Sequence, residues 1–290
     1  MFNVRYCRFL NRAALINQDS SQEPHEKDKS WSLCTVEEVE DLKKLIKIMP
    51  LWSTSILLST PIGVTLSFTV LMALVMDRSI GSHFKVPAGT FVVVTLIFTA
   101  ITTSTYDNFI APLYTKLTGR NLTFLQAIGV GHVSNILAMI GFALVERKRL
   151  SIVQAQNLTT QPNAVAPMSA LWLVFPLAIM GIGEGLYFPA EVALYYQEFP
   201  SKLRSTSTSM ISLHIAGGYY LSSAFIDLVG RLSSWLPNDI NNGRVDKACW
   251  VLLVIAVLNY GYFLLCALTY KYNNPDPELD DETSVVAPDH

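Results

Sequence analysis

Long apolar runs without a charged residue alternate with short polar segments along this chain of 290 residues. Five runs of 21 to 29 residues contain no Asp, Glu, Lys or Arg, namely 48–76, 86–106, 121–145, 205–226 and 248–270. A sixth apolar segment, from Met168 to Tyr196, carries only two charges, Glu184 and Glu191. Because about 20 apolar residues cross the hydrocarbon core of a bilayer as a helix, the pattern predicts an all-α membrane protein with six transmembrane helices.

The predicted elements follow these runs. We expect a six-helix transmembrane bundle over residues 31–272, with spans at about 45–76, 86–108, 123–146, 167–196, 203–229 and 247–271. Thr35 and Glu38 have the spacing of a capping box, which predicts a helix that begins there and continues into the first span. Outside the bundle, the pattern predicts an amphipathic helix at 1–16, a flexible linker at 17–30 and a disordered tail at 273–290, all cytosolic.

Composition supports the membrane class and argues against several functions. The chain is 51% hydrophobic and 15% charged, whereas about 25% of the residues in a soluble domain are charged. Its net charge of −2 provides no basic surface for nucleic acid. The four cysteines are scattered, and the sequence has no GxSxG motif or metal-ligand cluster. We therefore expect no cofactor, no metal and no enzymatic activity, and, without an early apolar core, no cleaved signal.

The distribution of Lys and Arg predicts the orientation of the spans. If both termini lie on one side, that side holds 13 Lys and Arg, and the opposite side holds eight, among them Arg147 and Arg149. This difference favours cytosolic termini. Asn157 begins an Asn-Leu-Thr sequon on the luminal side of such a chain, whereas the sequon at Asn121 is cytosolic. Asn157 is thus the candidate glycosylation site, although sequons this short also occur by chance.

Several ordered strings of the sequence resemble the plant nitrate/peptide transporters. They include RFLNRAAL, WSLCTVEEVEDLKKLIKIMPLW, VMDRSIGSHFKVPAG, LTGR and IGVGH. Those transporters belong to the proton-coupled oligopeptide transporter group of the major facilitator superfamily. Two further strings, FPAEVALYYQEFPSKLRSTSTSMISL and WLPNDINNGRVDKACWVLLVIAVLNYGYFLLC, resemble the branch called nitrate excretion transporters.

The resemblance implies the C-terminal half of a carrier. Full members have twelve spans in two six-helix bundles, and this chain resembles the second bundle with the cytosolic loop before it. The proton-coupling motif of the first span, two Glu followed by Glu-Arg, does not occur in the sequence. The implied function is proton-linked transport or excretion of a small anion, with nitrate favoured, by alternating access in the plasma membrane. The implied partners are the anion, protons, the bilayer and a missing or separate N-terminal half.

Two alternatives stay open. The chain could be a non-transporting membrane protein that associates with full-length carriers. As a carrier, it could instead move chloride, peptides or organic anions.

Glu184 is the leading candidate for proton coupling. A carboxylate inside an apolar span is costly unless it faces a cavity or is protonated. The resemblance matches Glu184 to the acidic residue of the family's GxGEAF pattern and implies a substrate-linked role. Gly181 and Gly185 surround it as a GxxxG motif, which predicts close packing against a neighbouring helix.

Two further residues of the same span belong to this candidate site. Glu191 lies seven residues after Glu184 and shares its helical face. It either takes part in the acidic role or faces water near the membrane surface. Tyr187 lies three residues after Glu184, and it could hydrogen-bond the acid or a substrate, or serve only in packing.

Polar residues of other spans are candidates for the lining of the transport cavity. Thr60 and Thr65 flank a predicted kink at Pro61, where a broken helix end would attract an anion through its dipole and free N–H groups. His214 lies in a span rich in Ser, Thr and Gly. A lone His in a helix bundle is more often a packing residue, so a ligand or proton role and a packing role both stay open.

Overall fold

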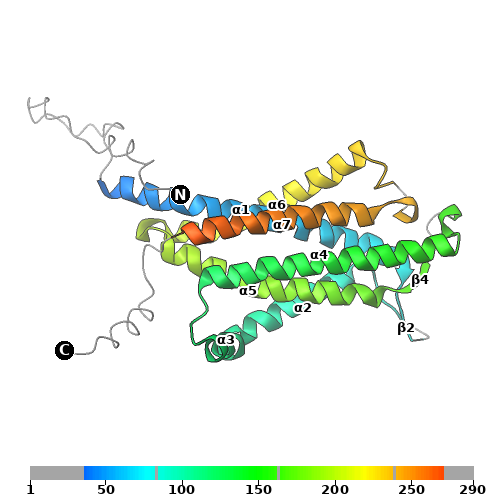
Figure 1. The fold of residues 1–290 in the computed structure, drawn as a ribbon, viewed down its shortest axis with the longest axis horizontal. Helices are drawn as coiled ribbons and strands as arrows, with labels where there is room; N and C mark the ends of the chain where they lie inside the picture. Colours follow the sequence, from blue (N-terminus) through cyan, green and yellow to red (C-terminus); the bar gives the residue numbers. More distant parts are fainter. Residues whose placement is uncertain (1–35, 82–83, 162–163, 238–239, 271–290) are drawn as a thin grey trace, which may run out of the picture.

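The computed structural model describes residues 36–81, 84–161, 164–237 and 240–270. The segments predicted as an amphipathic helix (1–16), a linker (17–30) and a tail (273–290) lie outside the described residues. Most of the described chain is helical (Figure 1). Its α-helices are α1 (Val36–Leu74), α2 (Thr90–Thr105), α3 (Ala111–Thr118), α4 (Phe124–Ala155), α5 (Val174–Glu198), α6 (Arg204–Leu232) and α7 (Val245–Thr269).

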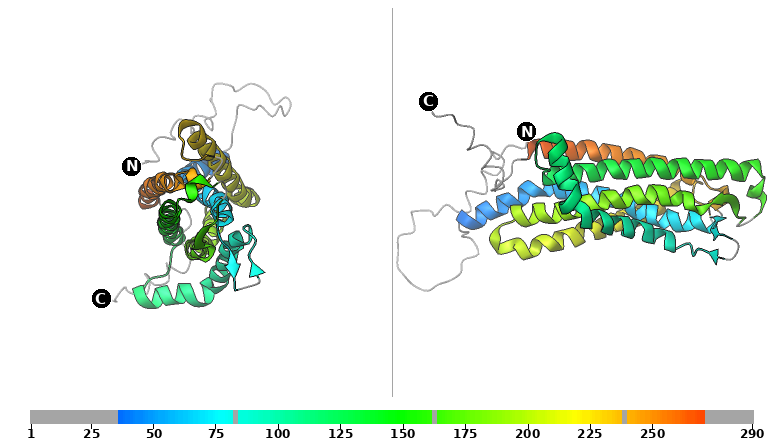
Figure 2. Two further views of the ribbon diagram at one scale, coloured as in Figure 1. Left: turned by 90° about the vertical axis from the view of Figure 1, so that its right-hand side faces the viewer. Right: turned by 90° about the horizontal axis from the view of Figure 1, so that it is seen from below.

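The long helices run side by side in an elongated bundle (Figures 1 and 2). α5 packs against α2, α4 and α6, and α1 packs against α6 and α7. The short helix α3 lies across the direction of the others (Figure 2). Short 3₁₀ turns connect the elements, at η3 (Leu158–Thr160), η4 (Ala170–Leu173), η5 (Ser201–Leu203) and η6 (Ile240–Asn242).

Four helical segments of the described chain are long and apolar enough to cross a membrane. They are Glu37–Leu74, Phe124–Ala155, Ala170–Glu198 and Val245–Thr269. α2 and the helix that follows it would add a fifth if the two pieces, which are bent by 57°, form one broken span. α6 is 29 residues long but does not reach the same hydropathy, because Ser, Thr and Gly occupy many of its positions. The predicted helical membrane class is therefore confirmed, whereas these helices do not establish the predicted number of six spans.

The chain after α2 contains more helix than the sequence predicted. The segment Tyr106–Ile110 forms a π-helical turn, η2, and α3 follows where a loop over 109–122 was expected. A π-turn often accompanies a sharp bend in a helix. α3 ends at Gly119, whose φ of 68° is left-handed, and Thr123 caps the start of α4. α4 then continues past its predicted end at 146 to Ala155.

Short strands lie at the opposite end of the bundle from α3 (Figure 1). The parallel pair is β1 (Met76–Asp77) with β4 (Ala166–Ser169), and the antiparallel pair is β2 (Ser79–Ile80) with β3 (Phe84–Lys85). The Ser79 amide donates a hydrogen bond of 3.0 Å to the Asp77 carboxylate. This bond holds the pKa of Asp77 below its usual value. The MDRSIG string thus forms a turn between α1 and α2.

Glycines set the separation between α5 and its neighbours. A Cβ atom on Gly181 would lie 2.4 Å from the carbonyl oxygen of Thr95 in α2, and Gly185 faces α2 in the same way. On the other side of α5, a Cβ atom on Gly183 would lie 2.7 Å from the Cβ of Ser134 in α4. The predicted close packing at the GxxxG motif is confirmed, and α2 is the partner helix.

Candidate functional site

A cavity of about 190 Å³ lies beside Glu184, between α1, α2, α5 and α6. Its wall is mostly apolar, with polar groups at few positions. The polar lining residues are Ser59, Thr95, Glu184, Tyr187 and Tyr219. A space of this size is large enough for a small anion together with water. Glu184 is the one carboxylate among the described residues that line it.

The carboxylate of Glu184 is buried and has few hydrogen bonds. The Glu184 side chain is 8% exposed, and the Thr99 hydroxyl of α2 lies 3.2 Å from its Oε2 atom. The same hydroxyl is 2.9 Å from the carbonyl oxygen of Thr95 and 3.1 Å from that of Gly181. A single hydroxyl hydrogen cannot serve three acceptors at once. An ionised Glu184 is therefore poorly satisfied by the described part of the chain.

Two hydroxyls in the same cavity also lack partners. Tyr187 is almost fully buried, and neither its hydroxyl nor that of Ser59 has a hydrogen-bond partner of acceptable geometry among the described residues. Buried polar atoms without a partner are rare because each costs free energy. Both residues line the cavity, so a polar ligand in that space would lie next to two hydroxyl-bearing side chains as well as the acid.

Glu191 is buried inside the protein, although the sequence left open that it faces water. Its side chain is 1% exposed, which contradicts the alternative that Glu191 faces water near the membrane surface. The Tyr195 hydroxyl donates a hydrogen bond of 2.7 Å to Glu191 Oε1. His214 Nε2, on α6, lies 3.5 Å from the other carboxylate oxygen. Glu191 is thus enclosed by side chains from its own helix and from α6.

The three residues predicted to line the transport cavity lie outside the wall of this one. The Thr60 hydroxyl donates to the carbonyl oxygen of Ile56 (3.1 Å), and the Thr65 hydroxyl contacts Met139 Sδ (3.4 Å). His214 is fully buried beside Glu191 instead. The two hydroxyls therefore contact protein atoms, and the His214 ring lies against the Glu191 carboxylate.

The anion site expected at a broken helix end near Pro61 is not formed. α1 continues as one helix from Val36 to Leu74, with Pro61 inside it. A continuous helix offers no exposed N-terminus with free N–H groups at its middle. The prediction of a helix-end anion site there is wrong.

α2 contributes to the site, although the sequence pattern did not predict this. Thr95, Thr99 and Thr102 recur at spacings of four and three residues, so they share one helical face. That face meets Gly181 and Gly185 of α5. The periodic threonines were the signal that α2 supplies the hydroxyl next to Glu184.

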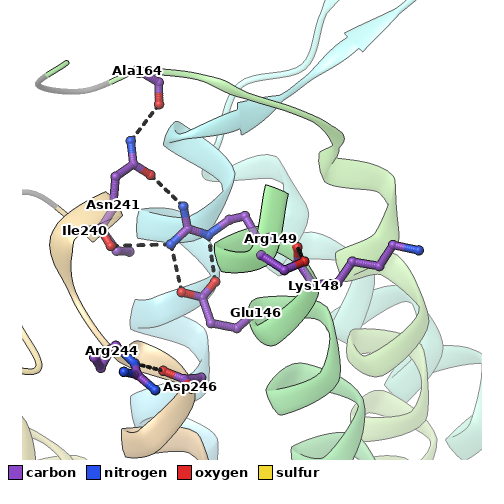
Figure 3. A network of polar contacts seen from close by, with 9 residues as sticks. Glu146, Lys148, Arg149, Ala164, Ile240, Asn241, Arg244 and Asp246 are labelled. Atoms are coloured by element: carbon purple, nitrogen blue, oxygen red, sulfur yellow. Dashed lines mark hydrogen bonds and ion pairs between the residues drawn. The ribbon is translucent and has the colours of Figure 1, made fainter. Parts of the chain in front are cut away.

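A second polar cluster lies at the far end of α4, beyond its predicted boundary (Figure 3). Arg149 is fully buried and makes a bidentate ion pair with Glu146, with N···O distances of 2.7 and 2.8 Å. Its Nη1 donates to Asn241 Oδ1 (2.6 Å), and Asn241 Nδ2 donates to the carbonyl oxygen of Ala164 (2.8 Å). Arg149 was predicted to be a loop charge, but it lies inside the protein. The cluster joins α4 to η6 and to the segment before β4.

Asn157 lies on the surface just after α4, in a left-handed conformation (φ 53°) at the start of η3. The sequon asparagine is therefore exposed, and glycosylation of Asn157 stays a prediction.

Comparison with known proteins places these features in a family. The pattern described as the POT family matches residues 5–241. Two relatives from Arabidopsis thaliana, Protein NRT1/ PTR FAMILY 2.7 and Protein NRT1/ PTR FAMILY 2.6, are each 50% identical to this chain. The matches cover 92% and 96% of this chain, and 48% and 50% of the two relatives. The chain thus spans about half the length of these curated relatives.

Solved structures support the same assignment at the level of the fold. An auto-inhibited POT family peptide transporter superimposes with a TM-score of 0.61 at 15% identity, over 83% of this chain and 44% of that one. The POT family transporter PepTSo gives a TM-score of 0.59 at 17% identity, over 81% of this chain and 43% of that one. The family pattern, the relatives and the fold agree with the resemblance found in the sequence, and the chain belongs to the POT family.

Proposed function

We propose that the chain is the C-terminal six-helix bundle of a proton-linked carrier for a small anion, with nitrate as the favoured substrate, and that Glu184 holds the coupling proton. The observation that carries the proposal is a buried, under-satisfied carboxylate on the wall of a cavity, next to two residues whose buried hydroxyls have no hydrogen-bond partner of acceptable geometry among the described residues. The resemblance of the sequence to plant nitrate/peptide transporters supports nitrate. One of the similar solved structures is a peptide transporter, so a peptide is the first alternative substrate.

The geometry around Glu184 suggests how a proton and an anion could move together. An ionised Glu184 would repel an anion in the adjacent cavity, because Coulomb energies are large in a weakly polarisable interior. A protonated Glu184 carries no charge and has a hydroxyl to donate. It could donate to the Thr99 hydroxyl oxygen, which would leave the Thr99 hydrogen for the Gly181 or Thr95 carbonyl. Entry of the anion would then require prior uptake of the proton.

The membrane arrangement is part of this proposal. The six spans would be α1, α2 with α3, α4, α5, α6 and α7, with both termini in the cytosol and the carrier in the plasma membrane. The excess of Lys and Arg on the side of the termini, 13 against eight, supports this orientation. Alternating access needs two bundles that rock about a shared site, so transport would require an N-terminal half.

The direct test is nitrate flux in proteoliposomes with an imposed pH gradient. We expect no flux from the 290-residue chain alone. We expect flux after fusion to the portion of Protein NRT1/ PTR FAMILY 2.7 that the chain does not match. Proton-driven nitrate flux from the unfused chain would contradict the half-carrier proposal. Flux of chloride, an organic anion or a peptide by the fusion, without nitrate flux, would contradict the choice of substrate.

A second candidate is a non-transporting membrane protein that associates with full-length carriers. The described bundle exposes large apolar side chains, for example Leu117, Tyr220 and Leu268, at 77% to 83% exposure, which would suit lipid or another bundle. Folded, membrane-inserted fusion protein without flux of any tested solute, together with co-purification of a full-length relative, would favour this candidate.

A further inference from the structure

A buried acid–base pair that the cavity does not include lies between α5 and α6. Glu191 is 1% exposed and His214 is fully buried, with 3.5 Å between Glu191 Oε2 and His214 Nε2. Neither of these two atoms has a hydrogen-bond partner of acceptable geometry among the described residues, and the same holds for His214 Nδ1. The two side chains thus face each other across a helix–helix contact, with these nitrogen and oxygen atoms toward each other.

The surroundings of the pair contain no compensating charge within the described residues. From α5, the Tyr195 hydroxyl donates to Glu191 Oε1, and the Tyr187 ring lies further along the same face. From α6, the carbonyl oxygen of Met210 lies toward His214, and from α1 the neighbouring group is the Ser55 hydroxyl. The groups around the pair are therefore phenols, a hydroxyl and a carbonyl, and no Lys or Arg is among them.

A net charge is expensive in such a place. With an ionised glutamate and a neutral histidine, the pair carries a charge of −1 that the surroundings do not balance. Uptake of one proton makes the pair neutral overall, either as a carboxylic acid that donates to Nε2 or as an imidazolium that donates to the carboxylate. In both forms the proton lies between the two atoms that now lack partners.

We propose that Glu191 and His214 form a second proton-binding site, which shares one proton between a carboxylate and an imidazole and is separate from Glu184. Seven residues of helix separate the two acids, or roughly 10 Å along the axis of α5. Of these two acids, Glu184 lines the cavity and Glu191 does not. The proposal deepens the proposed proton-linked function, on which its role in transport rests, but the proton site itself does not depend on transport.

The test follows His214 directly, without a transport assay. The full chain, labelled with ¹³C and ¹⁵N in its five histidines, is placed in lipid nanodiscs, and the ring signals are followed by NMR as a function of pH. Loss of one signal in His214→Gln assigns His214. We expect Glu191→Gln to change the pH midpoint of the His214 signal by about one unit or more, as for strongly interacting sites. The signal of His132, which stacks on Phe263 at 4.6 Å, serves as the internal control and stays unchanged.

An unchanged His214 midpoint in Glu191→Gln would overturn the proposal. A reciprocal experiment remains if Glu191→Gln folds poorly. The C=O band of the Glu191 carboxylic acid is followed by infrared spectroscopy as a function of pH, in the wild type and in His214→Gln. An equal pH midpoint of this band in both proteins would also overturn the proposal. A change of the His214 midpoint in Glu184→Gln would show one coupled site instead of two. If the fusion protein shows the shared proton but moves no solute, the shared-proton site is supported and the proposed transport function is contradicted.

Discussion

Two buried polar regions of this chain differ in how completely their hydrogen-bonding groups are used. Around Arg149, all three guanidinium nitrogens donate, to Glu146 or Asn241. Around Glu184 and Glu191, several buried polar atoms have no partner in the described part of the chain. Burial alone therefore does not distinguish a structural glutamate from a functional one, because Glu146 is buried at least as deeply as the two acids of α5.

The difference lies in what completes each region. The Arg149 cluster is closed by its own members, so it needs nothing from outside and holds three chain segments together (Figure 3). The acids of α5 are left with unused hydrogen-bonding capacity beside a cavity or beside a histidine. A fold keeps such atoms when a proton, water or solute supplies the missing partner for part of the time. These properties suit a structural role for the first region and the binding role that we propose for the second.

The largest effect on stability is expected from opening the closed cluster. Arg149→Met leaves the Glu146 carboxylate buried without its cation, and this should lower the free energy of unfolding by about 3–5 kcal/mol. The measurement is equilibrium unfolding in mixed micelles. Glu146→Leu combined with Arg149→Met removes both charges and should recover most of the loss, because no unpaired ion remains.

The matched control for that experiment is an exposed ion pair. Arg231 lies 2.9 Å from Asp227, and both side chains are mostly exposed. Arg231→Met should therefore cost less than about 1 kcal/mol. Equal losses at Arg149 and Arg231 would contradict the structural role given to the Arg149 cluster.

A smaller loss should follow from separating α2 and α5. In Gly181→Ala the new methyl group would meet the Thr95 carbonyl, at 2.4 Å, and a backbone atom cannot move aside as a flexible side chain can. We expect a loss of about 1–3 kcal/mol by overpacking, with Glu184 moved away from Thr99. In the control, Gly261→Ala, no atom lies within 4 Å of the new Cβ, so stability should stay equal or rise by up to about 1 kcal/mol. A stable Gly181→Ala with full activity in the fusion would argue against close packing as the basis of the site.

Glu184→Gln should change stability little and pH dependence greatly. The amide keeps the size and hydrogen-bonding capacity of the acid but cannot titrate. In the fusion protein, the pH dependence of flux should flatten while the amount of protein in the membrane is unchanged. The control is Thr103→Val, which removes a hydroxyl that donates to the Gly185 carbonyl (3.2 Å) and not to the acid. An intact pH profile in Glu184→Gln would move the coupling proton elsewhere, with the Glu191–His214 pair as the next place to look.

The smallest effect concerns the side of the membrane on which the Arg149 cluster lies. Asn157 follows the Arg149 end of α4, and Asn121 precedes the start of the same helix. With cytosolic termini, expression in a eukaryotic membrane should add one glycan to the wild type and none to Asn157→Gln, with no change in folding. If the glycan is lost in Asn121→Gln instead, the helices have the opposite orientation in the membrane.

The sequence predicted the helices well where the physical signal is local. Apolar runs give the approximate positions of α1, α4, α5, α6 and α7 because spanning a bilayer demands long uncharged segments. The burial of Glu184 followed from its place inside such a run. α3 was not predicted because residues 109–122 mix polar and apolar side chains. The end of α4 was placed too early because the charged residues Arg147, Lys148 and Arg149 are typical of a loop.

The partners of the buried charged residues could not be predicted from local sequence patterns. Arg149 meets Asn241 from 92 positions away, and Glu191 meets His214 from the next helix. Such pairings depend on the rotation of each helix about its axis, which a single sequence does not specify. One part of the Arg149 cluster was local, however, because Glu146 and Arg149 are three residues apart on a helix and thus neighbours on its surface.

Three glycines at every second position of α5 limit which substitutions residues 181–185 can accept. Gly181 and Gly185 face α2 while Gly183 faces α4, so every second position has a helix backbone where a side chain would have to fit. Ile182, between them, is 40% exposed and is free to exchange with other apolar residues. Positions 181, 183 and 185 should therefore stay glycine among descendants of the sequence and Glu184 should stay acidic, whereas position 182 should vary among apolar residues.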